Sequence, residues 1–377
     1  MRKIKYLKLL TIIFIVLLPA SGCWDAKDIN DQEIVTAALI DRTDTGYVYY
    51  VEIASISGSA SGDESAKGVK KPIIVKAEGK DFVEARENLD RELNKPVFLG
   101  ASHAVIVTDR MAAADIEGYL LRLRELHDYR KTIDIVVIHG DPEDFMSINP
   151  ANQQSVGFAI DSTITGLTSA GEWFHFTLAD VMAILSSPYK HYVLCTFANR
   201  NGEVTLIGFT VFSGGVKTGF IPAEDCKSIV LMNSRSPHIW LNIPYKDMQV
   251  AVDVRLIKKR ITPYYTNDKP SFDVDLSLKA TLLYPEKEKR ITDEAKEEIK
   301  KSVQSELQKE LEDTFSKSQT EYQYDCFGLH DYFRIYFPDE YKKMNWAEEY
   351  ETVAAHFTTS LDLEISDLID YNPPLKK

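Results

Sequence analysis

Four residues near the start of the chain, Ala20, Ser21, Gly22 and Cys23, have the types and the order required for covalent modification of a thiol. Small residues directly before a cysteine form the processing site of a lipoprotein signal. In such a signal, diacylglycerol is joined to the cysteine sulfur by a thioether, and the chain is cut just ahead of that cysteine. We therefore expect Cys23 to be the lipid attachment site, with a diacylglyceryl group and an N-acyl chain.

The residues before Cys23 have the three parts of a secretory signal. A basic start without acidic residues precedes an apolar run from Leu9 to Leu18, and a break at Pro19 follows. Ten helical residues at about 1.5 Å each cover about half of a bilayer core of roughly 30 Å, so this run is too short to be a stable span. Two acyl chains hold a protein stably, whereas one binds reversibly. The alternative is a plain signal peptide followed by an incidental cysteine.

A catalytic pattern is also present, because Ser187-Pro188-Tyr189-Lys190 and Lys217-Thr218-Gly219 resemble the S-x-x-K and K-T-G pair of penicillin-binding enzymes. That chemistry needs the serine and the lysine one helical turn apart, and Pro188 disfavours helical geometry at Ser187. The separation of Ser187 from Lys217 is also too short for the domain that lies between these motifs in such enzymes. We interpret the match as coincidence.

The spacing of the histidines and cysteines is not typical of a metal site or of a redox-active cysteine pair. The chain has eight histidines without paired spacing. Three cysteines remain besides Cys23, an odd number without a C-x-x-C pair. We expect Cys195, Cys226 and Cys326 to be buried free thiols, and we expect no cofactor.

The charge of the chain argues against two classes of partner. The formal net charge is −13, and the first 22 residues contribute four cations and no acid, so the processed chain carries −17. A negative field repels phosphate groups. Nucleic acid is therefore excluded as a partner, and attachment to anionic lipid by charge is excluded too.

The N-terminal half alternates predicted strands and helices, which is typical of a sheet with helices packed on it. An apolar run predicts a buried strand over Ile34 to Ile40, close behind Cys23. Further strands are expected at Ala104 to Val107 and Ile133 to Ile138. Helices are expected from Asp81 to Pro96, around Met111 to Tyr129, from Asp141 and from Thr177. The polar stretch from Ser57 to Lys71 predicts a flexible surface loop.

Hairpins and one long helix characterise the C-terminal half. Ser213-Gly214-Gly215 separates two apolar runs, which predicts a hairpin. Alternating residues from Val250 and from Phe272 predict two half-buried strands joined by a turn at Asn267 to Pro270. A helix is expected from about Thr292 to Lys317, and a last strand is expected from Val353 to Ile365.

The fold class expected from these patterns is α+β, in several domains, with mixed sheets and helices packed on them. Residues 1–22 are the expected signal peptide, and residues 23–200 are an N-terminal α/β domain that folds as one unit or as two subdomains. Residues 203–370 are expected to form a C-terminal α+β domain, with an antiparallel-rich sheet and one long helix. Ten aromatic residues between Tyr322 and Tyr350 are expected to fill a core beside that helix, with some left for a partner.

Several motifs resemble the Ger(x)C family, the C-subunit lipoproteins of spore germinant receptors. Near the start these are Cys23-Trp24-Asp25, Ile29-Asn30-Asp31 and Ile40-Asp41, and then Phe98-Leu99-Gly100-Ala101-Ser102-His103. In the C-terminal half they are Tyr322-Gln323-Tyr324-Asp325-Cys326-Phe327-Gly328, Tyr336-Phe337-Pro338 and Trp346. The resemblance covers nearly all of the chain after Cys23.

This resemblance implies a subunit without catalytic activity, on the outer face of the inner spore membrane. Its partners would be the integral-membrane A and B subunits of a receptor for small nutrients, and the lipid anchor would be its own link to the membrane. Two other classes stay open, an extracytoplasmic substrate-binding lipoprotein of a transporter and a cell-wall enzyme. An importer protein would have two similar lobes around a cleft, whereas this chain ends in hairpins and a single long helix.

Overall fold

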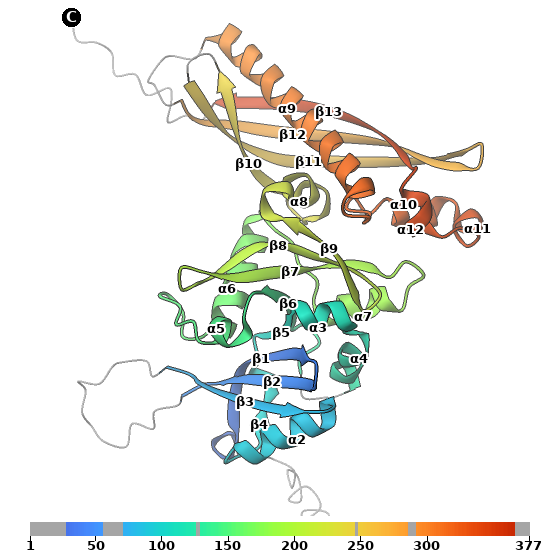
Figure 1. Ribbon diagram of the computed structural model, residues 1–377. Helices are drawn as coiled ribbons and strands as arrows, with labels where there is room; N and C mark the ends of the chain where they lie inside the picture. Colours follow the sequence, from blue (N-terminus) through green and yellow to red (C-terminus); the bar gives the residue numbers. More distant parts are fainter. Residues whose placement is uncertain (1–27, 56–70, 126–128, 246–247, 286–291, 366–377) are drawn as a thin grey trace, which may run out of the picture.

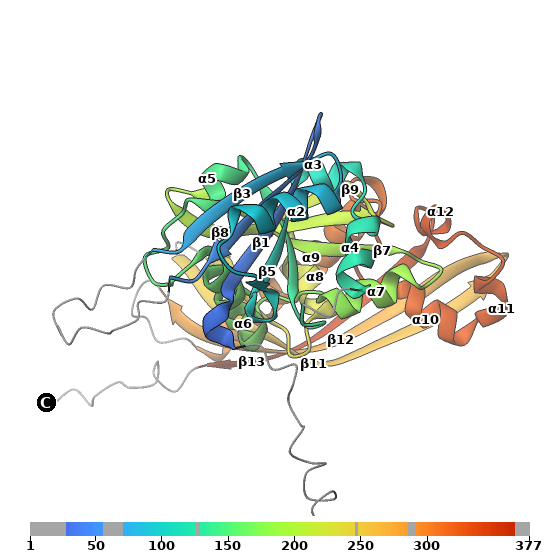
Figure 2. The same cartoon turned by 90° about the horizontal axis from the view of Figure 1, so that it is seen from below.

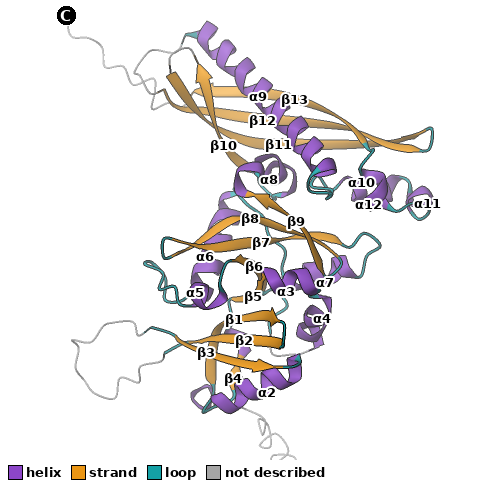
Figure 3. Ribbon diagram, in the orientation of Figure 1, coloured by secondary structure: helices purple, strands orange, loops and turns teal. Residues whose placement is uncertain are grey.

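The computed structural model of the protein describes residues 28–55, 71–125, 129–245, 248–285 and 292–365. In Figure 1 a lower sheet with helices around it carries the start of the chain, and an upper sheet crossed by the long helix α9 carries its end. Figure 3 shows that strands and helices both contribute largely to the molecule. These two sheets, both of mixed strand direction and with helices packed on them, confirm the predicted α+β class.

Within the described residues the first sheet has nine strands, eight of them in the order β3-β2-β1-β5-β6-β7-β8-β9, with β4 beside β1. Strands β1, β5, β6 and β7 run parallel, and hairpins add antiparallel strands on both sides. The bounds are β1 (Glu33–Thr43), β2 (Gly46–Ile53), β3 (Ile73–Gly79), β4 (Val97–Phe98), β5 (Ala104–Thr108), β6 (Asp134–His139), β7 (His191–Arg200), β8 (Glu203–Ser213) and β9 (Val216–Pro222).

Helices cover both faces of this sheet, as the view from below in Figure 2 shows. One face carries α2 (Phe82–Glu92), α3 (Asp109–Ala114), α4 (Glu117–Glu125) and α7 (Leu178–Leu185). The opposite face carries α5 (Pro142–Met146) and α6 (Val156–Ala170). Helices therefore leave the sheet in opposite directions after neighbouring strands.

Side-chain caps explain where several of these helices begin. Asp81 accepts hydrogen bonds from the backbone of Val83 and Glu84 at the start of α2, and Asp141 caps α5, whose first residue is Pro142. Thr177 and Asp180 form a capping box at α7. These three predicted helix starts are confirmed.

The predicted helix around Met111 to Tyr129 is corrected to two helices, α3 and α4. Asp115 has φ of 103°, which ends α3, and its carboxylate accepts a hydrogen bond of 2.8 Å from the backbone of Glu117 in α4. The backbone of Ile116 bonds to Gly215 in the β8–β9 hairpin. This contact with a distant hairpin fixes the break, and residues 126–128 lie outside the described residues.

The second sheet has the order β10-β11-β12-β13. Its strands are β10 (His238–Tyr245), β11 (Met248–Thr266), β12 (Lys269–Pro285) and β13 (Ala354–Ile365), of which β13 runs parallel to β12. Asn267 and Asp268, with φ of 53° and 57°, make the two-residue turn of the long hairpin. The alternating strands, the turn and the last strand are confirmed.

The long helix α9 (Asp293–Thr320) begins at the cap residue Thr292 and buries every fourth residue against this sheet. Shorter elements complete the chain. They are η2 (Ile29–Asp31), η3 (Leu99–Ala101), η4 (Ala223–Asp225), α8 (Lys227–Asn233), α10 (Leu329–Tyr336), α11 (Pro338–Tyr341) and α12 (Trp346–Tyr350).

A continuous apolar core joins the two sheets. Buried residues run from the α5 and α6 face of the first sheet through α8 to the second sheet beneath α9. The turn at 200–203, where the sequence analysis places a domain boundary, joins the paired strands β7 and β8, and the chain changes sheet later, after Pro222. Division into folding units at that turn stays a prediction, and the surface loop predicted from Ser57 lies largely outside the described residues.

Candidate functional site

Cys23, the predicted lipid attachment site, lies outside the described residues. The described chain begins at Asp28, which we call the chain exit. The exit is tied to the loop after α2, because Lys95 Nζ donates to the backbone oxygen of Asn30 at 2.6 Å. The backbone of Glu33 donates to Pro96 at 2.9 Å.

The residues of the penicillin-binding pattern are engaged in separate contacts. The Ser187 hydroxyl donates to backbone oxygens, at 2.8 Å to Ile184 and 2.7 Å to Tyr189. Lys190 lies 4.0 Å from the Glu117 carboxylate, and Lys217 Nζ lies 2.5 Å from Asp109. Neither lysine contacts the serine among the described bonds, which agrees with the interpretation of the pattern as coincidence.

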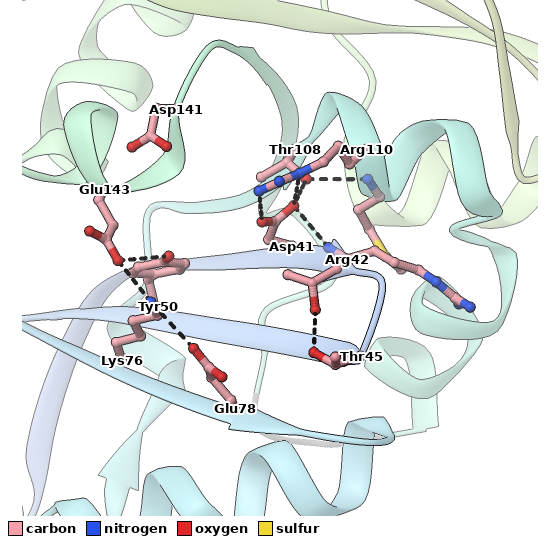
Figure 4. Close-up of polar contacts among 12 residues, drawn as sticks. Asp41, Arg42, Thr45, Tyr50, Lys76, Glu78, Thr108, Arg110, Asp141 and Glu143 are labelled. Carbon is pink, nitrogen blue, oxygen red and sulfur yellow. Dashed lines mark hydrogen bonds and ion pairs between the residues drawn. The ribbon is translucent and has the colours of Figure 1, made fainter.

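The carboxyl ends of parallel strands are where ligands bind in open α/β sheets, at points where successive connections leave toward opposite faces. Strands β5 and β6 meet this description, because α3 and α5 pack on opposite faces. Figure 4 shows the polar residues gathered beside this edge. A ligand site in this fold would therefore be expected at the carboxyl ends of β5 and β6.

Asp41, at the end of β1, is the buried member of this group. Its side chain is 2% exposed and accepts hydrogen bonds from Thr108 and from the guanidinium of Arg110 (Figure 4). The backbone of Arg42 donates to it as well, at 2.9 Å. Charge-assisted bonds of this kind offset the cost of burying a carboxylate. Asp41 thus fastens the end of β1 to the start of α3.

Several other charges at this edge are paired with one another. Lys76 Nζ lies 2.8 Å from Glu143 and 3.3 Å from Glu78. Burial alone would raise the pKa of Asp109, but hydrogen bonds from His139 and Lys217 lower it below its usual value. Because carboxylates and cations neutralise each other here, the arrangement joins strand ends and is not typical of acid–base catalysis.

The family motif that begins at Phe98 lies at the opposite, amino edge of the parallel strands. The Ser102 hydroxyl donates to the buried backbone of Val35 at 3.1 Å, and the backbone of His103 donates to Thr36. His103 Nδ1 lies 2.6 Å from the Asp161 carboxylate on α6. The motif therefore holds β1, β5 and α6 together.

Asp134 and His175 lie at the same amino edge. Burial and the nearby carboxylate of Asp161 raise the pKa of Asp134 to about 7. Burial lowers the pKa of His175, whose Nε2 lies 3.3 Å from Asp134. Within the described residues no group of histidine, cysteine and carboxylate side chains has the arrangement of a metal site.

Glu52 is a fully buried carboxylate that the sequence analysis did not identify. It accepts hydrogen bonds of 2.7 Å from the backbone of Val156 and 3.1 Å from that of Gly157, at the start of α6. The Thr36 hydroxyl also donates to it, at 2.7 Å. A negative charge at a helix N-terminus is stabilised by the helix dipole. Nothing in the local sequence signals this role, because Glu52 and α6 are far apart along the chain.

Asp325, in the second family motif, is a further buried carboxylate that several hydrogen-bond donors surround. It accepts from the backbone of Leu329 and His330 at 3.0 and 2.7 Å, and from Trp346 Nε1 at 3.2 Å. Gly328, with φ of 67°, allows the chain to turn into α10 between these contacts. The backbone of Asp325 also donates to the hydroxyl of Tyr189, just before β7 of the first sheet, so the motif lies where the two sheets meet.

The aromatic segment predicted to fill a core largely does so. Tyr322, Phe327, Phe333, Trp346 and Tyr350 are buried between the second sheet and the end of α9. Two neighbours on α10 point outward instead, Ile335 at 66% and Tyr336 at 64% exposed. These two residues are the exposed apolar part of the segment, and they are called the α10 patch below.

The predicted free thiols are confirmed by their environment. Cys195, Cys226 and Cys326 are buried and make no disulfide. Burial raises the pKa of Cys195 to about 12 and that of the other two well above the usual value. Buried thiols that resist ionisation are poor nucleophiles.

A shallow groove of about 440 Å³ lies between η4 and α9, where the two sheets approach each other. Its lining is mostly charged and includes the ion pair of Asp225 with Lys317, 2.8 Å apart. Small-molecule sites are mostly apolar with few polar groups. The composition of this groove is therefore not typical of such a site.

None of the helices in the described part of the chain combines the length and the apolar composition needed to cross a bilayer.

Two family descriptions match the chain in succession. "Spore germination protein N-terminal domain" matches residues 25–198, and "Spore germination B3/ GerAC like, C-terminal" matches residues 207–367. The two matches fall on either side of the turn between β7 and β8. Together they span most of the chain.

Curated proteins of Bacillus subtilis (strain 168) are similar over nearly the whole length. "Spore germination protein B3" is 21% identical, with 90% of this chain and 92% of that protein covered. "Spore germination protein KC" is 23% identical, with 91% of each chain covered. The crystal structure of the GerBC protein has a similar fold, with a TM-score of 0.58 over 86% of this chain and 96% of that chain at 14% identity.

Proposed function

The chain belongs to the spore germination B3/GerAC-like family, and from this membership we propose that it is the lipid-anchored, non-catalytic C subunit of a spore germinant receptor. In this proposal it stands on the outer face of the inner spore membrane, with integral-membrane A and B subunits as partners. The observation that carries the proposal is the succession of both family matches in one chain, and the predicted lipoprotein signal over residues 1–22, directly before Cys23, supports it.

Lipid attachment at Cys23 is the physical basis of the proposed location. The acidic body is repelled by anionic lipid, so a covalent anchor must supply the attachment. Burial of acyl chains contributes about 0.8 kcal/mol per methylene group, and two chains suffice for stable anchoring. The anchor would keep the subunit beside its membrane partners.

A role through protein contacts agrees with the polar chemistry of the two domains. The buried carboxylates Glu52 and Asp325 are occupied by backbone and side-chain donors. The charges at the carboxyl edge of the first sheet are paired within the fold. The transporter alternative is less well supported, because the two sheets differ in strand order and direction and do not form two similar lobes.

Deletion of the gene tests the proposed function. We expect spores that lack the protein, in a strain whose other C-subunit genes are also deleted, to lose nutrient-triggered germination and to keep germination by a receptor-independent trigger. The wild-type gene should restore the nutrient response, whereas a Cys23→Ala gene should not, because the unanchored protein leaves the membrane surface. Germination rates with the full range of nutrients provide the measurement. A nutrient response that does not depend on this gene would contradict the proposal.

The α10 patch provides a prediction about partner contacts. Exposed aromatic and aliphatic residues near each other are typical anchors of protein interfaces. We expect the double variant Ile335→Ala, Tyr336→Ala to reduce recovery of the A and B subunits with the affinity-tagged protein at least tenfold. The double variant Ile257→Ala, Val216→Ala, which removes two other exposed apolar residues, is the matched control. Equal recovery with both double variants would show that the patch is not an interface.

A further inference from the structure

The segment Pro96–Phe98 lies directly beside the chain exit. Besides the bonds of Lys95 to Asn30 and of Glu33 to Pro96, β4 pairs with the first residues of β1, with Ile34 opposite Phe98. In Figure 1, β4 lies at the end of the molecule remote from the second sheet. A membrane surface to which the start of the chain is attached would therefore lie close to this segment.

The distance from Cys23 to the chain exit is short. Four residues separate Cys23 from Asp28, and a fully extended chain spans at most about 3.5 Å per residue, so the tether reaches no more than roughly 18 Å. Each headgroup layer is about 5–8 Å thick. A lipid group on Cys23 therefore holds the exit and its immediate neighbours within a few side-chain lengths of the bilayer surface.

The side chains at this position are apolar and open to solvent. Pro96 is exposed, Val97 is half-buried, and Phe98 is 37% exposed, whereas the next residue, Leu99, is 3% exposed. The Phe98 ring lies over Gly100, where an added Cβ would come within 2.8 Å of the ring. The absence of a side chain at Gly100 therefore leaves room for the ring in this partly exposed position.

Charges of both signs surround this segment, with a small acidic excess to which the half-buried Glu33, opposite Val97, contributes. Arg91 and Lys95 are exposed beside it, and so are Asp28, Asp31 and Glu92. Such a surface neither attracts nor strongly repels anionic headgroups, so the contribution to membrane contact comes from the apolar side chains. Aromatic rings and the stems of lysine and arginine are favoured at the boundary between headgroups and acyl chains.

We propose that Pro96–Val97–Phe98 is a membrane-facing contact, in which the Phe98 ring enters the headgroup region of the phospholipid bilayer and sets the orientation of the anchored body. The proposal rests on lipid attachment at Cys23, which is part of the proposed function. The occupant is the phospholipid surface itself. A protein partner at the same place is the competing outcome that the experiment below separates.

Fluorescence quenching tests this orientation on the full-length lipidated protein in phosphatidylcholine vesicles. Phe98→Cys and, as a second reporter in the same segment, Lys95→Cys carry a dye, and Ile257→Cys on the second sheet is the control, exposed to a similar or greater extent. Cys195, Cys226 and Cys326 are buried and are expected not to take the dye, and the thiol of Cys23 carries the lipid in this protein. A melting curve for each labelled variant verifies that it is folded.

With nitroxide-labelled headgroups in the vesicles, we expect the dyes at 98 and 95 to be quenched at least threefold more than the dye at 257. Equally weak quenching at all three positions on vesicle-bound protein would overturn the proposal and would favour a protein partner for this segment. Protein that does not bind vesicles at all would instead contradict the lipid anchor. The two failures are therefore distinguishable.

Discussion

Replacing Asp325 with alanine is expected to lower the free energy of unfolding by about 3–5 kcal/mol. The substitution leaves the backbone N–H groups of Leu329 and His330 and the indole N–H of Trp346 without their acceptor in a region closed to water. Each buried donor without a partner costs about 1–3 kcal/mol. We expect the loss of stability to be greatest at the start of α10, next to the hydrogen bond with Tyr189 that links the two sheets.

Urea unfolding of the purified variant measures this effect. Asp331→Ala is the matched control, because its side chain is 55% exposed and its contacts are an exposed ion pair with Arg334 and a longer one, 3.7 Å, with His330. We expect that control to change stability by less than about 0.5 kcal/mol. Asp325→Asn retains one acceptor oxygen, so its loss in free energy of unfolding is expected to lie between those of Asp325→Ala and Asp331→Ala. An Asp325→Ala variant as stable as the control would show that the described hydrogen bonds do not hold the motif.

Replacing Glu52 with alanine is expected to have an effect of similar size, about 3–4 kcal/mol, on the first sheet. The carboxylate is fully buried, and the backbone N–H groups of Val156 and Gly157 lose their acceptor, while the Thr36 hydroxyl keeps only the backbone oxygen of residue 52, at 3.2 Å. Bonds from donors to a charged acceptor contribute about 1.5–3 kcal/mol each. The alanine also removes the negative charge that faces the positive end of the α6 dipole.

Hydrogen exchange separates this effect from a general loss of stability. In the Glu52→Ala variant, the first amides of α6 should exchange faster than those of α7, which has its own capping box. Glu87→Ala, an exposed substitution on α2, should leave both helices protected as in the wild type. Unchanged protection at the start of α6 in the Glu52 variant would contradict the role assigned to this carboxylate.

Sequence patterns predicted those elements whose signals are local and long. The α9 helix repeats an apolar residue every fourth position, and β11 and β12 alternate around a turn of asparagine and aspartate, so each could be predicted from its own residues. The helices α2, α5 and α7 were predicted from their capping residues. In these cases the local preference and the tertiary structure agree.

Helix α6 was missed because its stability comes from elsewhere in the chain. Its sequence contains glycine, threonine and serine, which are weak helix formers. Gly157 is needed because an added Cβ would come within 2.3 Å of the backbone oxygen of Thr36 on β1. Local caps are present, Ser155 at the start and Gly171 at the end, but Glu52 from β2 also accepts from the first two N–H groups of the helix. The contacts with β1 and β2 cannot be inferred from the residues of the helix alone.

The functional residues, like the helices and strands, could be predicted from the sequence only in part. The family motifs at Phe98 and at Tyr322 were recognised as residue patterns, but their physical roles became visible only with the fold. Asp325 caps α10 where the sheets meet, and Gly100 supports the Phe98 ring at the chain exit. Lipid attachment at Cys23 stays a prediction from sequence, because that residue lies outside the described part of the chain.

The measurement that tests the central claim most directly is the mass of the N-terminal peptide of the protein isolated from inner spore membranes. The account predicts a chain that begins at Cys23 and carries a diacylglyceryl group on its sulfur, recovered from detergent extracts together with integral-membrane receptor subunits. A chain that retains residues 1–22, or one that begins at or beyond Cys23 without lipid and is found free of the membrane, would contradict it.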